Sequence, residues 1–189
     1  MKTDREIEED NWAKDEFTEI DLADRRLNAR CQQLAHTLGK QPMSLINVAC
    51  EDWADSKAAY RFFDNEQVTP EEILSPHSQR TVKRMQGYPV VLAIQDTTFF
   101  NFTHHPNTEG LGPIGSKDHH QRGFGMHSTL IVSPAGQPLG LLTEKFILRK
   151  LGEAVQMRSR NQRLWLVHAS SANTRDGLAF EGDNVLRAH

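Results

Sequence analysis

The sequence predicts an α+β protein in which a helical N-terminal unit precedes a small β-sheet. Up to residue 86, apolar residues recur at the spacing of an α-helix, between residues that commonly start and end helices. Residues 88–102, YPVVLAIQDTTFFNF, then contain a nearly unbroken apolar run that is typical of a buried strand. Two further apolar segments flank a Pro/Gly turn, which predicts a β-hairpin.

Length and charge narrow the function classes. The 189 residues suffice for one ordinary domain or two small ones. A formal net charge of −3 excludes a globally basic nucleic-acid binder but leaves room for a local basic patch. No apolar run reaches the roughly 18 residues of a membrane span, and the charged N-terminus lacks a signal-peptide core. We therefore expect a cytoplasmic protein with no membrane partner, whose Cys31 and Cys50 stay reduced.

The first elements are an acidic start and a long helix. Residues 1–11 are acidic, and we expect them to be mobile. Asp21 can cap a helix that runs to about Leu38, where Gly39 is placed to end it. One face of this helix is apolar and should join the core: Leu27, Cys31, Leu34, Ala35 and Leu38.

Further helical segments follow. Ser44 opens a short helix over Leu45–Cys50, and WADSKAAYRFF predicts a helix over Trp53–Phe63. Thr69-Pro70 followed by two glutamates is a strong helix start, with a capping hydroxyl, a first-turn proline and acidic residues near the positive end. Ser75-Pro76 repeats this signal, so we expect a short helix and then a longer one to about Met85.

Basic residues recur along two of these helices. Arg26 and Arg30 stand four residues apart on the first, and Lys57 and Arg61 can point outward from the segment Trp53–Phe63. Rows of donors of this kind suit DNA phosphates. An ordinary solvated helix face would carry the same residues, and that alternative stays open.

The central strand leads to one carboxylate. The apolar run Val90–Ile94 predicts a strand buried on both faces, and Asp96 follows directly. A carboxylate at the end of such a strand stays solvated while the sheet fixes its position. The alternative is that Asp96 merely ends the strand or turns the chain.

A loop and a hairpin come next. Residues 103–125 are rich in Gly, Pro and His and predict a loop. The pairs His104-His105 and His119-His120 invite a zinc site, but adjacent histidines without a cysteine are not a standard ligand spacing, so a partly cationic loop is favoured. The hairpin that follows comprises Met126–Val132, a turn at 133–136 and Leu139–Leu148.

The pattern changes near Lys150. Residues 150–189 show no sustained periodicity, and beyond Lys150 every Lys or Arg is an arginine. An irregular tail that is read out of frame would explain both observations, and a disordered tail is the alternative. Leu164–Val167 is the one compact apolar cluster of this tail, and it could cover a little of the sheet as a strand or a short helix.

Five stretches, taken in order, carry a family resemblance. They are LADRRLNAR, AAYRFFDN, LAIQDTT, RGFGMHS and GLLTEKF. In order and approximate spacing they resemble the DDE transposases of bacterial insertion sequences, the type typified by transposon Tn-five and the insertion-sequence-four group. The resemblance covers about residues 12–149, which corresponds to the N-terminal part of that family.

The resemblance implies two domains. Residues 12–86 would be a helical domain that docks Arg26, Arg30, Lys57 and Arg61 on the double-stranded DNA of a transposon terminal repeat. Residues 87–149 would be the first three strands of an RNase H-like catalytic core. In the intact family three carboxylates hold two Mg²⁺ or Mn²⁺ ions, which lie roughly 3.5–4 Å apart. Asp96 matches the first of these catalytic and metal-binding carboxylates, and the other two lie beyond the matched region.

A chain with one such carboxylate should bind no metal stably and should be inactive alone. We therefore expect a truncated transposase that binds transposon ends without completing the chemistry. Two alternatives stay open: a remnant of a decayed element with no function, or a chain that is active only in complex with full-length transposase. Its partner would be a second copy of itself or that full-length protein.

Overall fold

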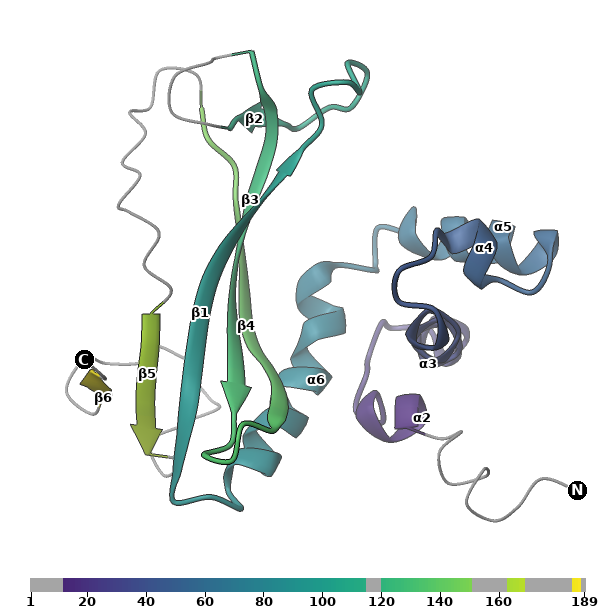
Figure 1. The fold of residues 1–189 in the computed structure, drawn as a ribbon. Coiled ribbons are helices and arrows are strands. Elements are labelled where there is room, and N and C mark those ends of the chain that lie inside the picture. The colour runs from purple at the N-terminus through teal and green to yellow at the C-terminus, as the bar shows by residue number, and fades with distance from the viewer. Residues whose placement is uncertain (1–11, 115–119, 151–162, 169–184, 188–189) are drawn as a thin grey trace, which may run out of the picture. The chain divides into compact units, whose positions relative to one another are not determined.

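A computed structural model describes residues 12–114, 120–150, 163–168 and 185–187 (Figure 1). The chain divides into two compact units, Met1–Arg80 and Thr81–His189. Helices come first in the chain and an antiparallel sheet follows, which confirms the predicted α+β class. In the described part of the chain, no helix is both long enough and apolar enough to cross a membrane.

Unit 1 is helical. Its helices are α2 (Trp12–Glu16), α3 (Arg25–Lys40), α4 (Ile46–Ala49), α5 (Trp53–Phe63) and the first part of α6 (Pro70–Met85). Residues of these helices and of the segments that join them form one core: Ile20, Leu22, Cys31, Leu34, Cys50, Ala59 and Phe62. The buried positions Cys31 and Leu34 confirm the predicted apolar face of α3.

The ends of α3 differ from the prediction. Asp24 caps the helix and not Asp21, since the Asp24 carboxylate accepts a hydrogen bond from the Arg26 N–H at 2.8 Å. The Asp21 carboxylate instead accepts a hydrogen bond from the Ala23 N–H, in the segment before the helix. At the other end α3 continues through Gly39. A Cβ at Gly39 would lie 2.5 Å from a ring atom of Trp12, so close packing on α2 explains this glycine.

The helix α6 is continuous, so the predicted break at Ser75-Pro76 is wrong. Thr69 starts it as expected, because its hydroxyl accepts from the Glu72 N–H at 3.2 Å. Pro76 lacks an N–H and gives up the bond to the Glu72 carbonyl. Burial of Val82 and Met85 further along the helix offsets that loss.

Unit 2 contains the sheet. Its strands are β1 (Val90–Asn101), β2 (Gly112–Pro113), β3 (Arg122–Val132), β4 (Pro138–Ile147), β5 (Arg163–His168) and β6 (Val185–Arg187). The order is β2-β3-β1-β5-β6, with β4 also paired to β3, and each of these pairings is antiparallel. The predicted hairpin is present as β3 and β4. Its turn is closed by hydrogen bonds between Ser133 and Gln137, and Gly136 adopts a φ of 84°.

One face of β1 is buried, not both. Val91 and Ala93 are buried against Val82 and Met85 of α6, in a core that also contains Ile131, Leu139 and Leu142. Leu92 and Ile94, on the opposite face, are only half-buried. In an antiparallel sheet alternate residues point to opposite faces, so an apolar run can lie in a strand that has one fully covered face.

The tail is not irregular throughout. The backbone of β5 pairs with β1 from Val90 opposite His168 to Gln95 opposite Arg163, and β6 pairs with β5. The expectation of an irregular segment over residues 150–189 is therefore wrong at these two strands. The apolar cluster Leu164–Val167 forms a strand because the edge of β1 offers it backbone partners. The rest of the tail and the acidic start at residues 1–11 lie outside the described residues.

Candidate nucleic-acid interface

The exposed side of α5 combines basic and aromatic side chains. Ser56, Ala59 and Phe62 face the core of unit 1. Lys57 and Arg61 lie one turn apart on the exposed side, and neither has a hydrogen bond or an ion pair among the described residues. Trp53 and Tyr60 are also exposed, at helical spacings from them. We call Trp53, Lys57, Tyr60 and Arg61 the α5 stripe.

The α5 stripe has the chemistry of a DNA contact surface. Lysine and arginine neutralise phosphates, which supplies most of the sequence-independent affinity for DNA. Aromatic rings present flat apolar surface that can contact bases or sugars, and an indole N–H or a phenol O–H can donate a hydrogen bond. Sequence reasoning identified the two cations and missed the two aromatic residues. The spacing of Trp53, Lys57 and Tyr60 by four and three residues could have revealed them.

Arg26 is exposed but has an intramolecular partner. Its side chain is 92% exposed, and its Nη2 lies 3.0 Å from Oδ2 of Asp24, the residue that caps α3. The side-chain hydrogen bond from Arg26 lowers the pKa of the Asp24 carboxyl and raises the pKa of Arg26 itself. Arg26 can therefore reach a phosphate only by sharing or leaving this contact.

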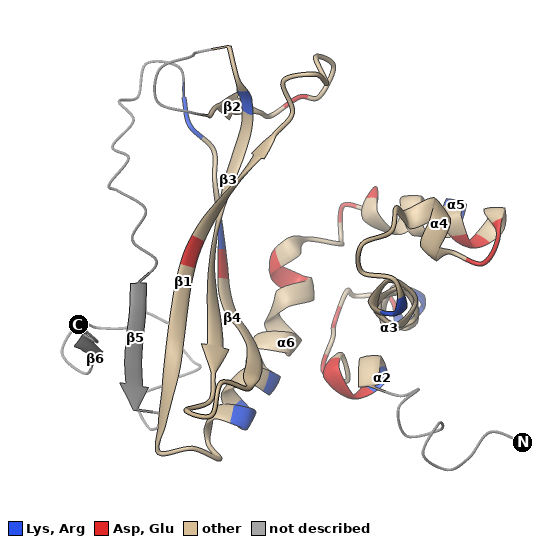
Figure 2. Ribbon diagram, in the orientation of Figure 1, with Lys and Arg blue, Asp and Glu red and all other residues tan. Residues whose placement is uncertain are grey.

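Arg30 joins two helices. Its Nη1 lies 3.5 Å from Oδ1 of Asp55, so the pair connects α3 to the first turn of α5. About a third of each side chain is exposed. The four cations predicted to bind DNA thus divide in two: Lys57 and Arg61 project together from α5, whereas Arg26 and Arg30 are engaged within unit 1. Figure 2 shows basic and acidic positions along the helices of unit 1.

Acidic residues adjoin the start of the α5 stripe. Asp52 caps α5 and accepts a hydrogen bond from the Asp55 N–H at 2.8 Å. Glu51 precedes it and is exposed. The basic part of the stripe is therefore its second half, where Lys57 and Arg61 lie.

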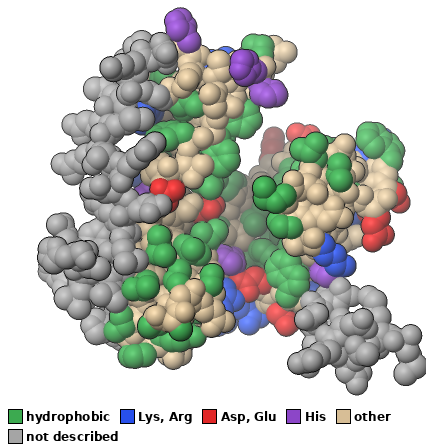
Figure 3. All heavy atoms as spheres, in the orientation of Figure 1, with side chains coloured by type: hydrophobic (Ala, Val, Ile, Leu, Met, Phe, Trp, Pro, Cys, Tyr) green, Lys and Arg blue, Asp and Glu red, His purple; other side chains and the backbone are tan. Residues whose placement is uncertain are grey.

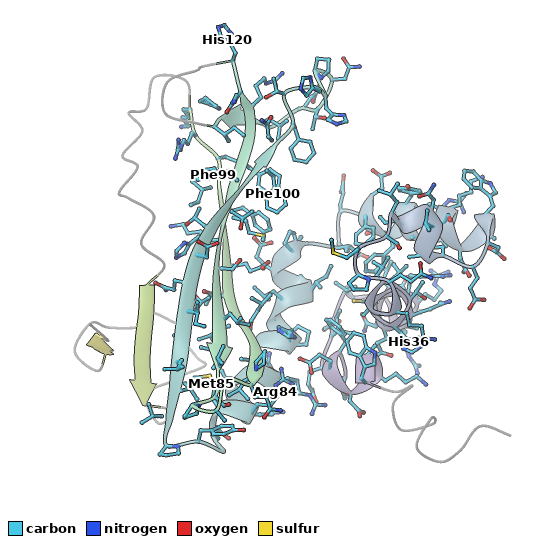
Figure 4. The ribbon with its side chains drawn as sticks, viewed as in Figure 1. His36, Arg84, Met85, Phe99, Phe100 and His120 are labelled. Atoms are coloured by element: carbon cyan, nitrogen blue, oxygen red, sulfur yellow. The ribbon has the colours of Figure 1, made fainter. Side chains whose placement is uncertain are left out.

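Asp96 lies inside β1, not at its end. The strand continues to Asn101, and Asp96 is exposed on the face opposite the core residues Val91 and Ala93. The prediction of a carboxylate at the end of the strand is wrong because β3 pairs with β1 as far as Asn101. Phe99 and Phe100, a few residues on, point to opposite sides of the strand (Figure 4).

The sheet brings a second carboxylate into line with Asp96. Asp96 is opposite Ser128 of β3, and Ser128 is opposite Glu144 of β4, so the three share one face. The Ser128 hydroxyl lies 3.4 Å from Oε1 of Glu144. Adjacent strands are about 4.8 Å apart, which puts the backbones of Asp96 and Glu144 about 10 Å apart. Counting from the turn at 133–136 would not have found this pairing, because irregularities between Thr129 and Leu130 and between Ile131 and Val132 shift β4 against β3.

This row does not by itself make a two-metal site. Hard divalent cations need several oxygen ligands, and two ions at one phosphate need closely grouped carboxylates. The described residues contain no group of at least three His, Cys, Asp or Glu side chains that could hold a metal ion. The residues that the structure describes therefore do not form the complete metal centre expected from the resemblance.

The described histidines of the predicted loop are exposed, and His127 lies on β3 of the sheet. His104, His105 and His120 are exposed, and His119 lies outside the described residues. On β3, Nδ1 of His127 lies 2.7 Å from the hydroxyl of Thr97, on the face of β1 opposite Asp96. Thr97 and His127 are thus a cross-strand pair that is separate from the carboxylate row.

One comparison with known proteins bears on these sites. Residues 9–68 match the family model of the transposase DNA-binding domain. The matched region contains α2 to α5, including the whole α5 stripe, and ends before α6. The match supports a transposase N-terminal part that binds DNA in transposition.

Proposed function

We propose that the chain binds the double-stranded DNA of a transposon terminal repeat through the α5 stripe of unit 1. The observation that carries this proposal is the position of Lys57 and Arg61, which project without a described partner from α5, inside the region matched to transposase DNA-binding domains. This DNA binding would take place in the cytoplasm, where the DNA of a bacterial element lies.

The proposed contacts divide by chemistry. Lys57 and Arg61 neutralise phosphates, and Trp53 and Tyr60, on the same side of α5, contact bases or sugars. Two cations alone give weak binding that depends little on sequence, so discrimination between DNA ends must come from the aromatic residues and from neighbouring side chains. Arg30 holds α5 against α3, which keeps the stripe in one orientation.

A competition titration tests this function. The full chain is titrated against a fluorescent duplex that carries the inverted repeat flanking the gene, and then against a scrambled duplex at the same salt concentration. Preference for the repeat, and its loss in the double variant Lys57→Gln/Arg61→Gln, would support the proposal. Lys145→Gln, a change at an exposed lysine of β4, is the matched control. Equal weak binding to both duplexes would contradict end recognition.

For unit 2 we propose an RNase H-like role as the first strands of a catalytic core of the Tn-five and insertion-sequence-four type. Support comes from three antiparallel strands that are neighbours in the sheet, β1, β3 and β4, with an exposed Asp96 on the first. Mg²⁺ or Mn²⁺ ions, if held by the complete carboxylate set of the family, would supply the metal-ion activation for phosphoryl transfer. The Asp96 carboxylate would be one metal ligand, and the pairing of β1 with β3 would fix its position.

We further propose that this chain alone is inactive as a nuclease or strand-transfer enzyme. The resemblance matches only Asp96 to one of the three carboxylates that the family chemistry uses. We propose full-length transposase as the partner that carries the remaining ligands. In that complex, or in a homodimer of this chain, end binding would be the contribution of unit 1.

A further inference from the structure

The exposed side of α3 carries cations and an amide but no carboxylate. The helix reads RRLNARCQQLAHTLGK, so none of its 16 residues is Asp or Glu. Arg26, Ala29, Gln33 and Lys40 are exposed, and we call these four residues the α3 face. At 3.6 residues per turn they lie within about 60° of one another around the helix axis, so they form one surface. Figure 3 shows Lys and Arg side chains on the surface over α3.

Two consecutive glutamines of α3 have different surroundings. The Gln32 side chain donates a hydrogen bond to the Phe17 carbonyl at 3.0 Å, which ties the segment after α2 to α3. Gln33 is exposed and makes no hydrogen bond with the residues that the structure describes. An amide side chain offers donors and an acceptor side by side. Gln33 therefore presents both kinds of group to solvent in the middle of the α3 face.

The rest of the α3 face suits the approach of DNA. Ala29, about one turn before Gln33, has a short side chain that allows close approach. Arg26 and Lys40 each stand seven residues from Gln33, about 10.5 Å along the axis in opposite directions. The carboxylates of the cap residue and of the first turn of α5 approach α3, and each pairs with an arginine of the helix. The α3 face is thus complementary to a polyanion, and α3 lies within the region matched to transposase DNA-binding domains.

We propose that α3 lies in the major groove of the bound DNA and that Gln33 determines specificity by reading an adenine there. The major groove admits an α-helix, and a glutamine amide can form two hydrogen bonds with adenine. The Gln33 amide N–H donates to N7, and its carbonyl oxygen accepts from the N6 amino group. Arg26 and Lys40 then point toward the phosphates on either side of the base. This inference rests on the proposed DNA-binding function and adds the residue that distinguishes one end sequence from another.

Replacing the N7 atom of single adenines tests this contact. The full chain is titrated against terminal-repeat duplexes in which one adenine at a time is 7-deazaadenine, which carries a C–H in place of the N7 acceptor. We expect one position at which this change weakens wild-type binding and has no further effect on Gln33→Ala. On the unmodified repeat, Gln33→Ala should bind about 5- to 150-fold more weakly, with little change on a scrambled duplex. Gln86→Ala, a change at an exposed glutamine of unit 2, is the matched control.

The outcomes separate base reading from end binding. If every 7-deazaadenine duplex affects the wild type and Gln33→Ala equally, base reading by Gln33 is wrong, while end binding through α5 stands. An equal loss on the repeat and on the scrambled duplex in Gln33→Ala would also overturn it, because base reading acts only on the repeat. If the wild type binds both duplexes equally, the proposed end recognition fails together with this inference.

Discussion

Arg30 is about one-third exposed and lies 3.5 Å from Asp55 of the neighbouring helix. Removing its charge in Arg30→Gln should lower the free energy of unfolding by about 0.2–1 kcal/mol, the range for a partly exposed ion pair. The salt dependence of DNA binding should stay unchanged if Arg30, paired with Asp55, positions α5 and leaves the phosphate contacts to Lys57 and Arg61. Urea unfolding and a salt titration measure the two effects, with exposed Arg25→Gln as control. A weaker salt dependence in Arg30→Gln would mean that Arg30 binds DNA directly.

Burial of Cys31 makes stability depend on alkaline pH. Burial raises the pKa of the Cys31 thiol to about 11, from the ordinary 9.0. Between these values the unfolded thiol loses its proton and the folded one keeps it, so the free energy of unfolding should fall as pH rises from 9 to 11. Chemical unfolding across this range should show a smaller decrease for Cys31→Ala. Equal decreases would show that other groups cause the alkaline loss.

Individual residues also show what sequence could predict. The chemical type of Lys57 and Arg61 and their spacing of four were sufficient to place them on one helix side. The partners of Arg26 and Arg30 were not predictable in the same way. Asp24 and Asp55 are ordinary acidic residues in sequence, and their roles follow from a cap geometry and from the packing of α3 on α5.

At the scale of elements, α6 lacks one backbone hydrogen bond because Pro76 lies inside it. Replacing Pro76 by alanine restores an N–H for the Glu72 carbonyl and should raise the free energy of unfolding by about 1–3 kcal/mol. Pro70→Ala is the control, because a proline at the first helical position costs little. Thermal unfolding of both variants provides the comparison. An unchanged or lower melting temperature for Pro76→Ala would mean that burial of the proline ring contributes at least as much as the missing hydrogen bond costs.

Local signals predicted most elements, and non-local pairing explains the exceptions. The helices and the β3–β4 hairpin follow from periodicity, caps and a turn within a few residues. The length of β1 beyond Asp96 depends on β3, because the residues from Thr97 to Asn101 pair with those from His127 back to Gly123. The strand β5 depends on the edge of β1, far away in sequence. Neither pairing can be predicted from the residues of the strand itself.

At the scale of the whole molecule, the chain pairs a DNA-binding unit with a sheet that bears one candidate catalytic carboxylate. We predict no nicking or joining of a plasmid with terminal repeats by this chain alone, with either Mg²⁺ or Mn²⁺. The physical reason is that Asp96 offers too few oxygen ligands for a hard cation. Gel analysis of supercoiled plasmid measures nicking directly. Metal-dependent nicking that disappears in Asp96→Ala would contradict this prediction and would require further ligands.

The central claim is that α5 binds DNA phosphates through Lys57 and Arg61, and the salt dependence of affinity tests it most directly. Each phosphate contact contributes about 0.9 to the slope of log affinity against log salt. The double variant Lys57→Gln/Arg61→Gln should therefore reduce the slope of the full chain by about 1.8. Lys145→Gln should leave it unchanged. A double variant with the wild-type slope would contradict the account, because the phosphate contacts would then lie elsewhere.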